Sequence, residues 1–261
     1  MGRVIAVANQ KGGVGKTTTA VNLAAYLAEG EGRSVLLIDS DPQGNTTSGL
    51  GIDKSRITDS IYDVLIDGIP ARRAIRATSI RNLHILASTI DLAGAEIELV
   101  PLIARETRLR KSLEETRNEF EFVIIDCPPS LGLLTINALA AADSVLIPIQ
   151  CEYYALEGLT QLLSTIRLVQ KNLNPDLVIE GVLLTMFDGR TNLSIEVADE
   201  VKRYFRHQVF RTVIPRNVRL SEAPGHGKPI IHYDPASRGA EVYSELAKEM
   251  VEHVQENSAS G

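Results

Sequence analysis

Residues 9–18 read NQKGGVGKTT and directly follow the short apolar run VIAVA. Gly12, Gly13 and Gly15 carry no Cβ, so successive backbone N–H groups of this stretch can converge on one anion. A helix is predicted to begin near Lys16, and its N-terminus adds partial positive charge at the same place. The stretch therefore predicts a strand, a phosphate-binding loop and a helix in succession, which is how an α/β nucleotide-binding fold begins.

The rest of the chain alternates apolar, β-rich segments with segments of helical periodicity. VIAVA and FVIID are continuous apolar runs, typical of strands that are covered on both faces of a parallel sheet. The predicted strands are Val4–Ala8, Val35–Asp39, Leu83–Ala87, Phe122–Asp126, Val145–Ile149, Val178–Thr185 and Val209–Ile214. The predicted helices are Lys16–Ala28, Glu96–Arg117 (broken near Pro101), Leu131–Ala142, Leu156–Asn172, Asn192–Phe205 and Arg238–Val254. We expect a single α/β domain over residues 1–256, a doubly wound, mostly parallel β-sheet flanked by helices, and a flexible tail at 257–261.

Composition limits the class of protein. The chain has 261 residues, of which 44% are hydrophobic and 23% charged, which is typical of a soluble globular domain. No apolar stretch approaches the roughly 20 residues that span a bilayer, and no signal peptide is evident. Two cysteines are too few for a disulfide scaffold and fit a reducing compartment. We therefore expect a cytoplasmic protein.

The loop and two strand ends supply the groups for phosphate chemistry. In the common phosphate loop, G-x-x-x-x-G-K-[ST], the lysine bridges the β- and γ-phosphates and the hydroxyl binds Mg²⁺; Lys16 and Thr17 hold these places. FVIID places Asp126 at the tip of a buried strand, where it would face the Mg²⁺ ion; the alternative is that Asp126 caps the following helix. The stretch departs from the common pattern in two ways, because Gln10 replaces the first glycine and Lys11 is an additional lysine.

Five segments in order carry a resemblance to one family. They are KGGVGKTT at 11–18, DSDPQGN at 39–45, VIIDCPPSLG at 123–132, QCEYYALEG at 150–158 and IPRNVRLSEAPGHGKPI at 214–230. Together they resemble the ParA/MinD group of ATPases with a deviant Walker A loop, and within it the small ParA/Soj type of chromosome-partition ATPase. The resemblance implies a P-loop NTPase fold, Mg²⁺-dependent ATP hydrolysis, a homodimer bridged by nucleotide, non-specific binding of double-stranded DNA, and a ParB-type centromere-binding partner.

The resemblance also implies roles for single residues. Asp41 would orient the attacking water, although a turn-forming aspartate before Pro42 is the alternative. Asp39 and Asp126 would bind Mg²⁺ through water. Lys11 would reach across the dimer to the phosphates of the partner chain, as an arginine finger does; the alternative is a solvated loop lysine. The implied nucleotide contacts are Lys11, Gly12, Gly13, Val14, Gly15, Lys16, Thr17, Thr18 and Glu152, with Pro215 and Asn217 near the adenine.

Charge is distributed unevenly along the chain. The net charge is −6, but residues 190–219 carry seven Lys or Arg against three acids, a net of +4, and the rest carries −10. A cationic segment on an anionic body suits sequence-independent binding to a phosphate backbone, although a solvated helix face is the simpler interpretation. The resemblance places Arg190 and Arg219 at DNA-contacting positions, and Lys202 and Arg206 belong to the same segment. ATP-driven pairing of two subunits would double these contacts and so switch DNA binding on.

Two rival functions share the same core. A MinD-like membrane-cycling ATPase would end in a basic amphipathic helix, whereas the helix predicted near the C-terminus has five acids and one lysine on its polar face, so we expect no membrane partner. Its apolar stripe, Tyr243, Leu246, Met250 and Val254, is expected to pack in the core. A metabolic ATP-dependent ligase or kinase would need a pocket for a second substrate. Cys127 and Cys151 are expected to be buried, inert thiols rather than ligands of an iron–sulfur cluster.

Overall fold

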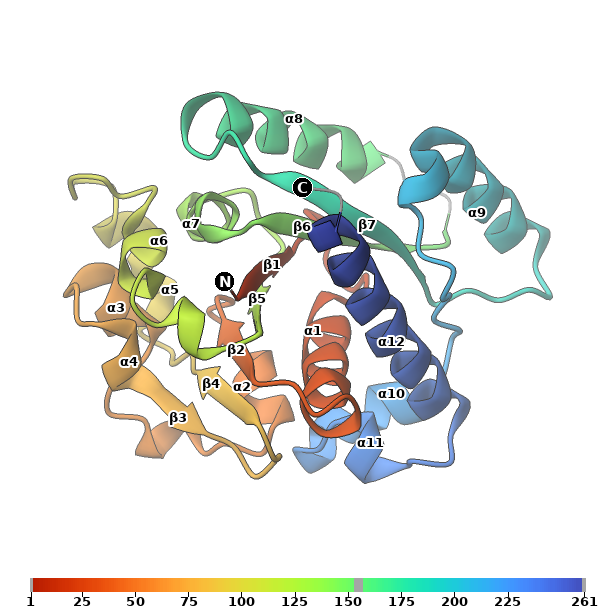
Figure 1. Cartoon of the computed structure of the whole chain (residues 1–261), viewed down its shortest axis with the longest axis horizontal. Helices are drawn as coiled ribbons and strands as arrows, with labels where there is room; N and C mark the ends of the chain where they lie inside the picture. The colour runs from red at the N-terminus through yellow and green to blue at the C-terminus, as the bar shows by residue number, and fades with distance from the viewer. Residues whose placement is uncertain (1, 153–156, 260–261) are drawn as a thin grey trace.

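The computed structural model describes residues 2–152 and 157–259 and contains one seven-stranded sheet (Figure 1). Its strands lie in the order β3-β4-β2-β5-β1-β6-β7, and all neighbouring pairs are parallel except β3 with β4. The strands are β1 (Arg3–Val7), β2 (Val35–Asp39), β3 (Ile75–Ala77), β4 (Leu83–Leu86), β5 (Phe122–Asp126), β6 (Ser144–Gln150) and β7 (Val178–Thr185). The predicted doubly wound, mostly parallel sheet is confirmed.

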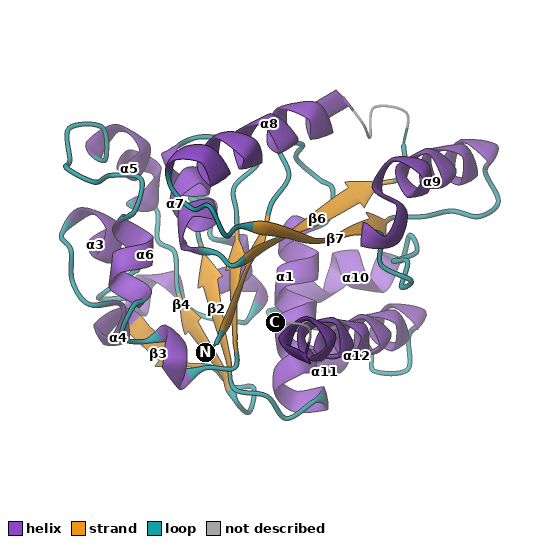
Figure 2. Cartoon of the chain, turned by 45° about the horizontal axis from the view of Figure 1, so that its top comes forward, coloured by secondary structure: helices purple, strands orange, loops and turns teal. Residues whose placement is uncertain are grey.

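Helices cover both faces of this sheet (Figure 2). α1 (Lys16–Ala25, followed by a π-helical turn at Tyr26–Gly30), α10 (Val218–Glu222), α11 (Ile230–Tyr233) and α12 (Arg238–Ala259) pack on one face. The other face is covered by α3 (Ile61–Ile66), α4 (Ala71–Ala74), α5 (Leu92–Glu98), α6 (Arg108–Leu113), α7 (Leu133–Ala141), α8 (Glu157–Asn172) and α9 (Asn192–Phe205). A short helix, α2 (Asn45–Gly49), follows β2 at the carboxyl end of the sheet.

The continuous apolar strands are buried on both sides, as their sequences predict. Val4 and Ala6 of β1 pack in the layer that contains α3–α9, and Ile5 and Val7 pack in the layer that contains α1 and α12; all four are fully buried. Burying a Val or Ile side chain stabilises the fold by roughly 1.5–3 kcal/mol. In a strand covered on both faces every side chain is buried, so every residue of the strand contributes rather than every second one.

The predicted strand at Val209–Ile214 is wrong. The backbone N–H groups of Arg211 and Thr212 donate to the carboxylate of Glu249 on α12, at 2.6 and 2.9 Å. Donors that are already occupied by a side chain cannot extend a ladder, so this segment makes only isolated bridges beside β7. The edge strand β3 was not predicted. The other six predicted strands are confirmed, each with its ends within one residue.

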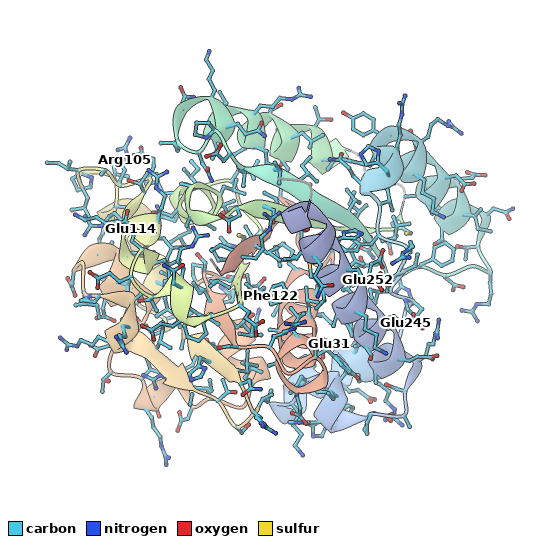
Figure 3. The ribbon with its side chains drawn as sticks, in the orientation of Figure 1. Glu31, Arg105, Glu114, Phe122, Glu245 and Glu252 are labelled. Atoms are coloured by element: carbon cyan, nitrogen blue, oxygen red, sulfur yellow. The ribbon has the colours of Figure 1, made fainter. Side chains whose placement is uncertain are left out.

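The last helix packs as its sequence pattern predicts. Tyr243, Leu246 and Met250 are almost completely buried in the core between α12 and the sheet. Glu245 and Glu252 project from α12 on its outer side (Figure 3). α12 continues to Ala259, beyond its predicted end, so most of the expected tail lies in a helix or outside the described residues, and its flexibility stays a prediction.

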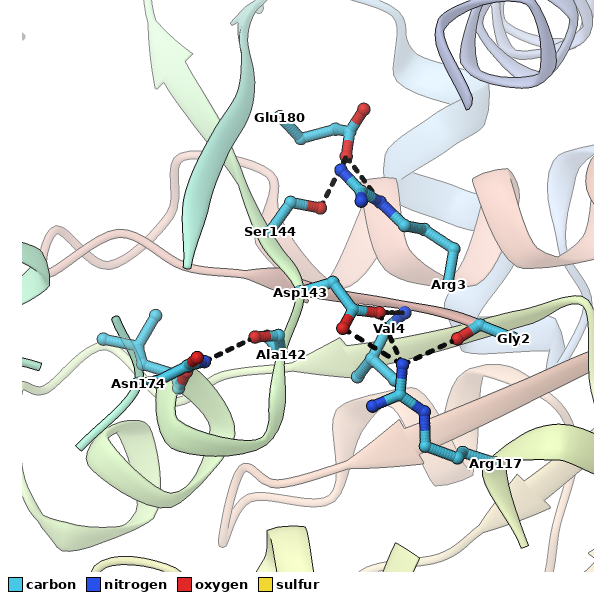
Figure 4. A network of polar contacts seen from close by, with 10 residues as sticks. Gly2, Arg3, Val4, Arg117, Ala142, Asp143, Ser144, Asn174 and Glu180 are labelled. Atoms are coloured by element: carbon cyan, nitrogen blue, oxygen red, sulfur yellow. Dashed lines mark hydrogen bonds and ion pairs between the residues drawn. The ribbon is translucent and has the colours of Figure 1, made fainter. Parts of the chain in front are cut away.

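Buried charge pairs fix the amino end of the central strands (Figure 4). Arg3 of β1 contacts Glu180 of β7 at 2.8 Å, and Ser144 of β6 donates to the same carboxylate oxygen. Asp143 accepts the N–H of Val4. These contacts join β1, β6 and β7 at the end of the sheet opposite the phosphate loop. In the described part of the chain, no helix has the length and apolar character that crossing a bilayer requires.

Candidate functional site

The glycine-rich loop lies at the carboxyl end of β1, and α1 begins directly after it. Gly13 and Gly15 have φ values of +74° and +87°, a region that residues with a Cβ rarely adopt, so the loop requires glycine at these two positions. The Thr185 hydroxyl at the end of β7 donates to the carbonyl of Val14 at 2.9 Å, and the amide of Asn9 donates to the carbonyl of Pro148 at 2.7 Å. Neighbouring strands therefore hold the loop in its anion-binding shape.

Lys16 is buried beneath this loop. Its ammonium group donates to the backbone carbonyl of Lys11 at 2.9 Å, and the residue is only 6% exposed. Burial lowers the pKa of Lys16, while the nearby negative charges, Asp126 first among them, oppose that shift. An ammonium group in such a place is stabilised by an anion bound in the loop.

Asp39 and Asp126 lie side by side at the ends of β2 and β5, where they are paired in register. Both are fully buried. One oxygen of Asp126, Oδ2, accepts hydrogen bonds from the hydroxyls of Thr17 at 2.8 Å and Thr46 at 2.7 Å. Asp39 Oδ2 accepts both the N–H and the hydroxyl of Thr47, at 2.8 and 2.6 Å. Two consecutive threonines of α2 thus hold the two carboxylates.

The environment of these carboxylates favours a bound cation. Burial, followed by the charge of Asp39, raises the pKa of Asp126 to about 7. Burial likewise raises the pKa of Asp39 to about 6. Asp126 Oδ1 is buried with no hydrogen-bond partner. Among the described residues no group of three or more His, Cys, Asp or Glu is arranged to hold a metal, so an ion here would also depend on the Thr17 hydroxyl and on ligand oxygens.

The alternatives for the two candidate aspartates have different outcomes. Asp126 does not cap the following helix, since its hydrogen bonds are those from the hydroxyls of Thr17 and Thr46. Asp41 does form a local turn, because its carboxylate accepts the N–H of Gln43 at 2.9 Å. Asp41 is also only 7% exposed, and its backbone carbonyl accepts the hydroxyl of Ser88. The turn holds Asp41 beside the carboxylate pair, so a structural role and a role in orienting water are compatible.

A pocket of about 230 Å³ opens on the other side of the loop, between α1 and the start of α10. Gly15, Thr18, Pro215 and Asn217 line it together with Met186, whose φ is +50°. The predicted nucleoside contacts Pro215 and Asn217 are therefore adjacent to the phosphate loop.

Two of the predicted nucleotide contacts already have partners within the chain. The side-chain oxygen of Asn217 accepts the N–H of Arg219 and caps α10, which leaves the amide donors of Asn217 for a ligand. Glu152 forms an ion pair with Arg216 at 3.0 Å and accepts a hydrogen bond from Gln150. The remainder of the motif that contains Glu152, residues 153–156, lies outside the described residues.

Lys11 differs from Lys16 in its surroundings. Both backbone groups of Lys11 are used, since its N–H donates to the side chain of Asn9 and its carbonyl accepts the ammonium of Lys16. Within residues 2–152 and 157–259, its own ammonium makes no hydrogen bond or ion pair. Lys11 is thus a cation in the phosphate loop that the described residues do not neutralise.

The four predicted DNA-contacting residues lie at separate places, on or next to α9 and on α10, which pack on opposite faces of the sheet. Arg190 precedes α9 and pairs with Asp188 at 2.7 Å, and Arg219 on α10 pairs with Glu222 at 3.0 Å. Lys202 lies in the last turn of α9 and Arg206 directly follows that helix, about 20 Å along the helix from Arg190. The four form a dispersed set rather than a compact cluster, and two of them are already paired with carboxylates.

Thr46, Thr47 and Ser88 belong to the site but were not predicted. Ser88 follows β4, and its N–H donates to the hydroxyl of Thr47 at 3.0 Å. The available signal was a pair of threonines directly after the DSDPQGN segment, at the end of a strand that delivers two acids. Cys127 and Cys151 are buried free thiols, as predicted, and burial raises the pKa of both.

Comparisons with known proteins identify relatives over nearly the whole length. A family model described as an AAA domain matches residues 2–179. The sporulation initiation inhibitor protein Soj of Bacillus subtilis is 66% identical over 96% of this chain and 98% of its own. The chromosome partitioning protein ParA of Myxococcus xanthus is 58% identical over 96% and 88%. The chromosome-partitioning ATPase Soj of Treponema pallidum is 51% identical over 96% and 98%.

One solved structure is similar in both sequence and shape. It is named cobyrinic acid a,c-diamide synthase from Mycobacterium smegmatis and contains ADP and magnesium. It is 41% identical to this chain, covers 98% of it and 96% of its own length, and superposes with a TM-score of 0.85.

Proposed function

Because this chain belongs to the ParA/Soj family of chromosome-partitioning ATPases, we propose that it hydrolyses ATP with Mg²⁺ and uses the nucleotide to time its binding to DNA. The observation that supports this most strongly is the contrast between its two loop lysines. Lys16 is buried beneath the glycine-rich loop, where it would meet a bound phosphate, and Lys11 is a cation without a partner among the described residues.

The residues around Asp126 fit a magnesium ion, and the solved structure of one relative contains ADP and magnesium. The Thr17 hydroxyl would bind the ion directly, and Asp39 and Asp126 would bind it through water, with Asp126 Oδ1 still free to accept a hydrogen bond. When bound, Mg²⁺ neutralises charge on the phosphates. Asp41, fixed by its turn, would orient the attacking water.

Nucleotide binding would reorganise the loop lysines. A phosphate group replaces the Lys11 carbonyl as the acceptor for Lys16, which frees the loop at Lys11. The Lys11 side chain of one subunit would then approach the phosphates held by the second subunit and neutralise the charge that develops there during hydrolysis. ATP would therefore bridge a homodimer, and hydrolysis would require pairing.

DNA binding would follow from that pairing. Arg190, Lys202, Arg206 and Arg219 would contact phosphates without reading bases, and a dimer presents twice as many of them as a monomer does. Each arginine that now pairs with a carboxylate is exposed, so solvent and salt weaken the existing pair. We infer an association with the nucleoid that ends on ATP hydrolysis, and a ParB-type centromere-binding protein that stimulates hydrolysis.

Paired lysine variants test this proposal. Lys16→Ala should lose binding of a fluorescent ATP analogue, because the buried ammonium is the main cation beneath the loop. Lys11→Ala should keep nucleotide binding but lose ATP-dependent dimerisation, DNA co-sedimentation and hydrolysis. Lys171→Ala, a change at the end of α8, is the control and should resemble the wild type. DNA retention by Lys16→Ala in ATP would refute the scheme.

The name of the Mycobacterium smegmatis structure favours a second candidate, an ATP-dependent amide ligase. A pocket of about 390 Å³ between α1, α2 and the segment after α10 could accept a second substrate. A ligase would hydrolyse or consume ATP at a rate indifferent to DNA. ATP turnover measured with and without double-stranded DNA therefore separates the two functions.

A further inference from the structure

The helix α5 is apolar on its outer side as well as on its buried side. Leu92, Ala95 and Leu99 pack in the core. Ile90 and Ile97 are each 78% exposed, although both are large apolar side chains. Large apolar side chains that are exposed together on one helix mark an interaction surface, so α5 presents an apolar surface that the described residues do not cover.

The exposed apolar residues form one stripe. Backbone hydrogen bonds from Leu92, Ala93 and Gly94 to residues three positions earlier extend the helical turns back to Thr89, and Val100 bonds to Ile97 in the same way. Ile90, Ala93, Ile97 and Val100 are spaced three, four and three residues apart, which places them on one face of these turns. Ile103, 91% exposed, is the next large apolar side chain that is exposed, since Leu102 packs against the core. We call Ile90, Ala93, Ile97, Val100 and Ile103 the α5 stripe.

Two acids run beside the α5 stripe. Asp91 and Glu98 are seven residues apart, so they share a face next to that of Ile90 and Ile97. Asp91 accepts a hydrogen bond from Thr89, and Glu98 accepts one from the hydroxyl of Tyr62. Neither carboxylate has an ion pair with the described residues. The surface therefore suits a segment with apolar side chains at helical spacing and Lys or Arg beside them.

Glu96 connects α5 with the catalytic loop. Its carboxylate accepts the N–H groups of Leu133 at 2.9 Å and Leu134 at 3.3 Å, at the start of α7. Gly132 permits this approach, because a Cβ there would lie 2.4 Å from the Glu96 carboxylate. Only residues 127–132 separate this contact from Asp126. Glu96 therefore links α5 to the short segment that follows Asp126 at the end of β5.

From this geometry we propose that the α5 stripe is the docking surface for a basic, apolar segment of the ParB-type partner, and that Glu96 transmits docking to residues 127–132, which follow Asp126. The inference rests on the proposed function, because it locates the partner named there. α5 lies beside α3 and α7 in its helical layer (Figures 1 and 2), and Ile90, Ile97, Val100 and Ile103 are exposed to solvent, so a segment can reach them.

The test uses the full-length protein and a fluorescent synthetic peptide of the N-terminal segment of the ParB-type protein from the same genome. Ile97→Ser should weaken peptide binding roughly tenfold, and Ile97→Ser with Ile103→Ser roughly a hundredfold, because each isoleucine loses its buried apolar area. Basal ATPase activity and ATP-dependent dimerisation should stay at wild-type values. Leu168→Ser, which changes a 61% exposed leucine on α8, is the matched control and should bind the peptide normally.

Two further variants test charge and coupling. Asp91→Lys should weaken binding of the peptide, because a positive charge replaces a negative one. A peptide with a Lys-to-Glu change should bind this variant better than it binds the wild type. Glu96→Gln should keep peptide binding but lose stimulation of hydrolysis.

Three outcomes would overturn the inference. The first is unchanged peptide affinity in the double variant, and the second is an equal loss of peptide affinity with Leu168→Ser. The third is loss of dimerisation with Ile97→Ser, which would show that the α5 stripe contacts a second copy of this chain. A wild-type protein that neither binds nor responds to the peptide would instead overturn the partner in the proposed function.

Discussion

At the residue scale, the pair of buried carboxylates opposes folding when no cation is present. Asp39 and Asp126 are adjacent in the sheet, and burial raises the pKa of both. Thr17, Thr46 and Thr47 offset part of this cost with hydroxyl donors. A site that is costly when empty binds a cation more readily, because the ion removes the repulsion between the carboxylates.

Replacing Asp126 with asparagine should stabilise the metal-free protein in a pH-dependent way. The folded pKa of about 7 lies above the unfolded value of 3.8, so the folded protein holds an extra proton between pH 4 and pH 7. The stability of the wild type therefore falls as the pH rises through this window. The advantage of Asp126→Asn should be smallest at pH 4 and reach at most about 4 kcal/mol above pH 7.

Thermal denaturation with EDTA at pH 4.5 and pH 8 measures this difference. Asp91→Asn, at an exposed carboxylate, is the control and should show no such trend. Asp126→Asn should also lose ATP hydrolysis. A stability difference that does not change with pH would show that Asp126 is ionised throughout.

At the scale of elements, β7 depends on a close approach by the segment that follows α9. A Cβ on Gly181 would lie 2.4 Å from the ring of Phe210, which is buried. Gly181→Ala should therefore destabilise the protein by about 1–3 kcal/mol, the usual cost of overpacking. Gly225→Ala is the control, because a Cβ there meets no atom within 4 Å. Urea denaturation measures both, and equal stability of the two variants would contradict the prediction.

The strands that are buried on both faces could be predicted because their information is local. VIAVA and FVIID are apolar throughout, and the glycine-rich loop marks the end of β1 and the start of α1. The segment at 209–214, VFRTVI, is also rich in β-branched and aromatic residues, but Glu249, distant in the sequence, accepts the N–H groups of Arg211 and Thr212. No local pattern reports such a contact.

The residues of the site also differ in whether a local sequence pattern predicts them. Lys16, Thr17 and Asp126 belong to motifs of fixed spacing, so the sequence places them. Thr46 and Thr47 were missed because the preceding Pro, Gly and Asn indicate a turn, whereas the carboxylate of Asp39 accepts the N–H of Thr47 within a short helix.

At the scale of the whole molecule, the uneven charge bears on the proposed binding to DNA. The segment at 190–219 is cationic while the remainder is strongly anionic, so this segment is the part of the chain that would attract a phosphate backbone. Part of this positive charge is balanced within the fold, since Arg211 pairs with Glu249 and Glu252 of α12. Few residues of each subunit would therefore contact DNA, and the proposed dimerisation would double their number.

Arg190→Ala should weaken DNA binding in ATP and lower its salt dependence. Each lost phosphate contact reduces the slope of log affinity against log salt by about 0.9, so a dimer should lose about 2. Nucleotide binding should not change. Arg73→Ala is the matched control, because Arg73 forms a similar exposed pair with Asp59 through two hydrogen bonds. An equal loss with Arg73→Ala would mean that net charge, not position, sets the affinity.

The place of β1 in the sheet has a consequence for biosynthesis. β1 is made first, yet its neighbours are β5 and β6, which lie more than a hundred residues later in the chain. At about 5–20 residues per second, a nascent chain carries this unpaired apolar strand for roughly 10–30 s before translation supplies both neighbours. The phosphate-loop segment is thus synthesised long before its neighbours in the sheet, so a chaperone that shields it until β6 has been made should raise the yield of folded protein.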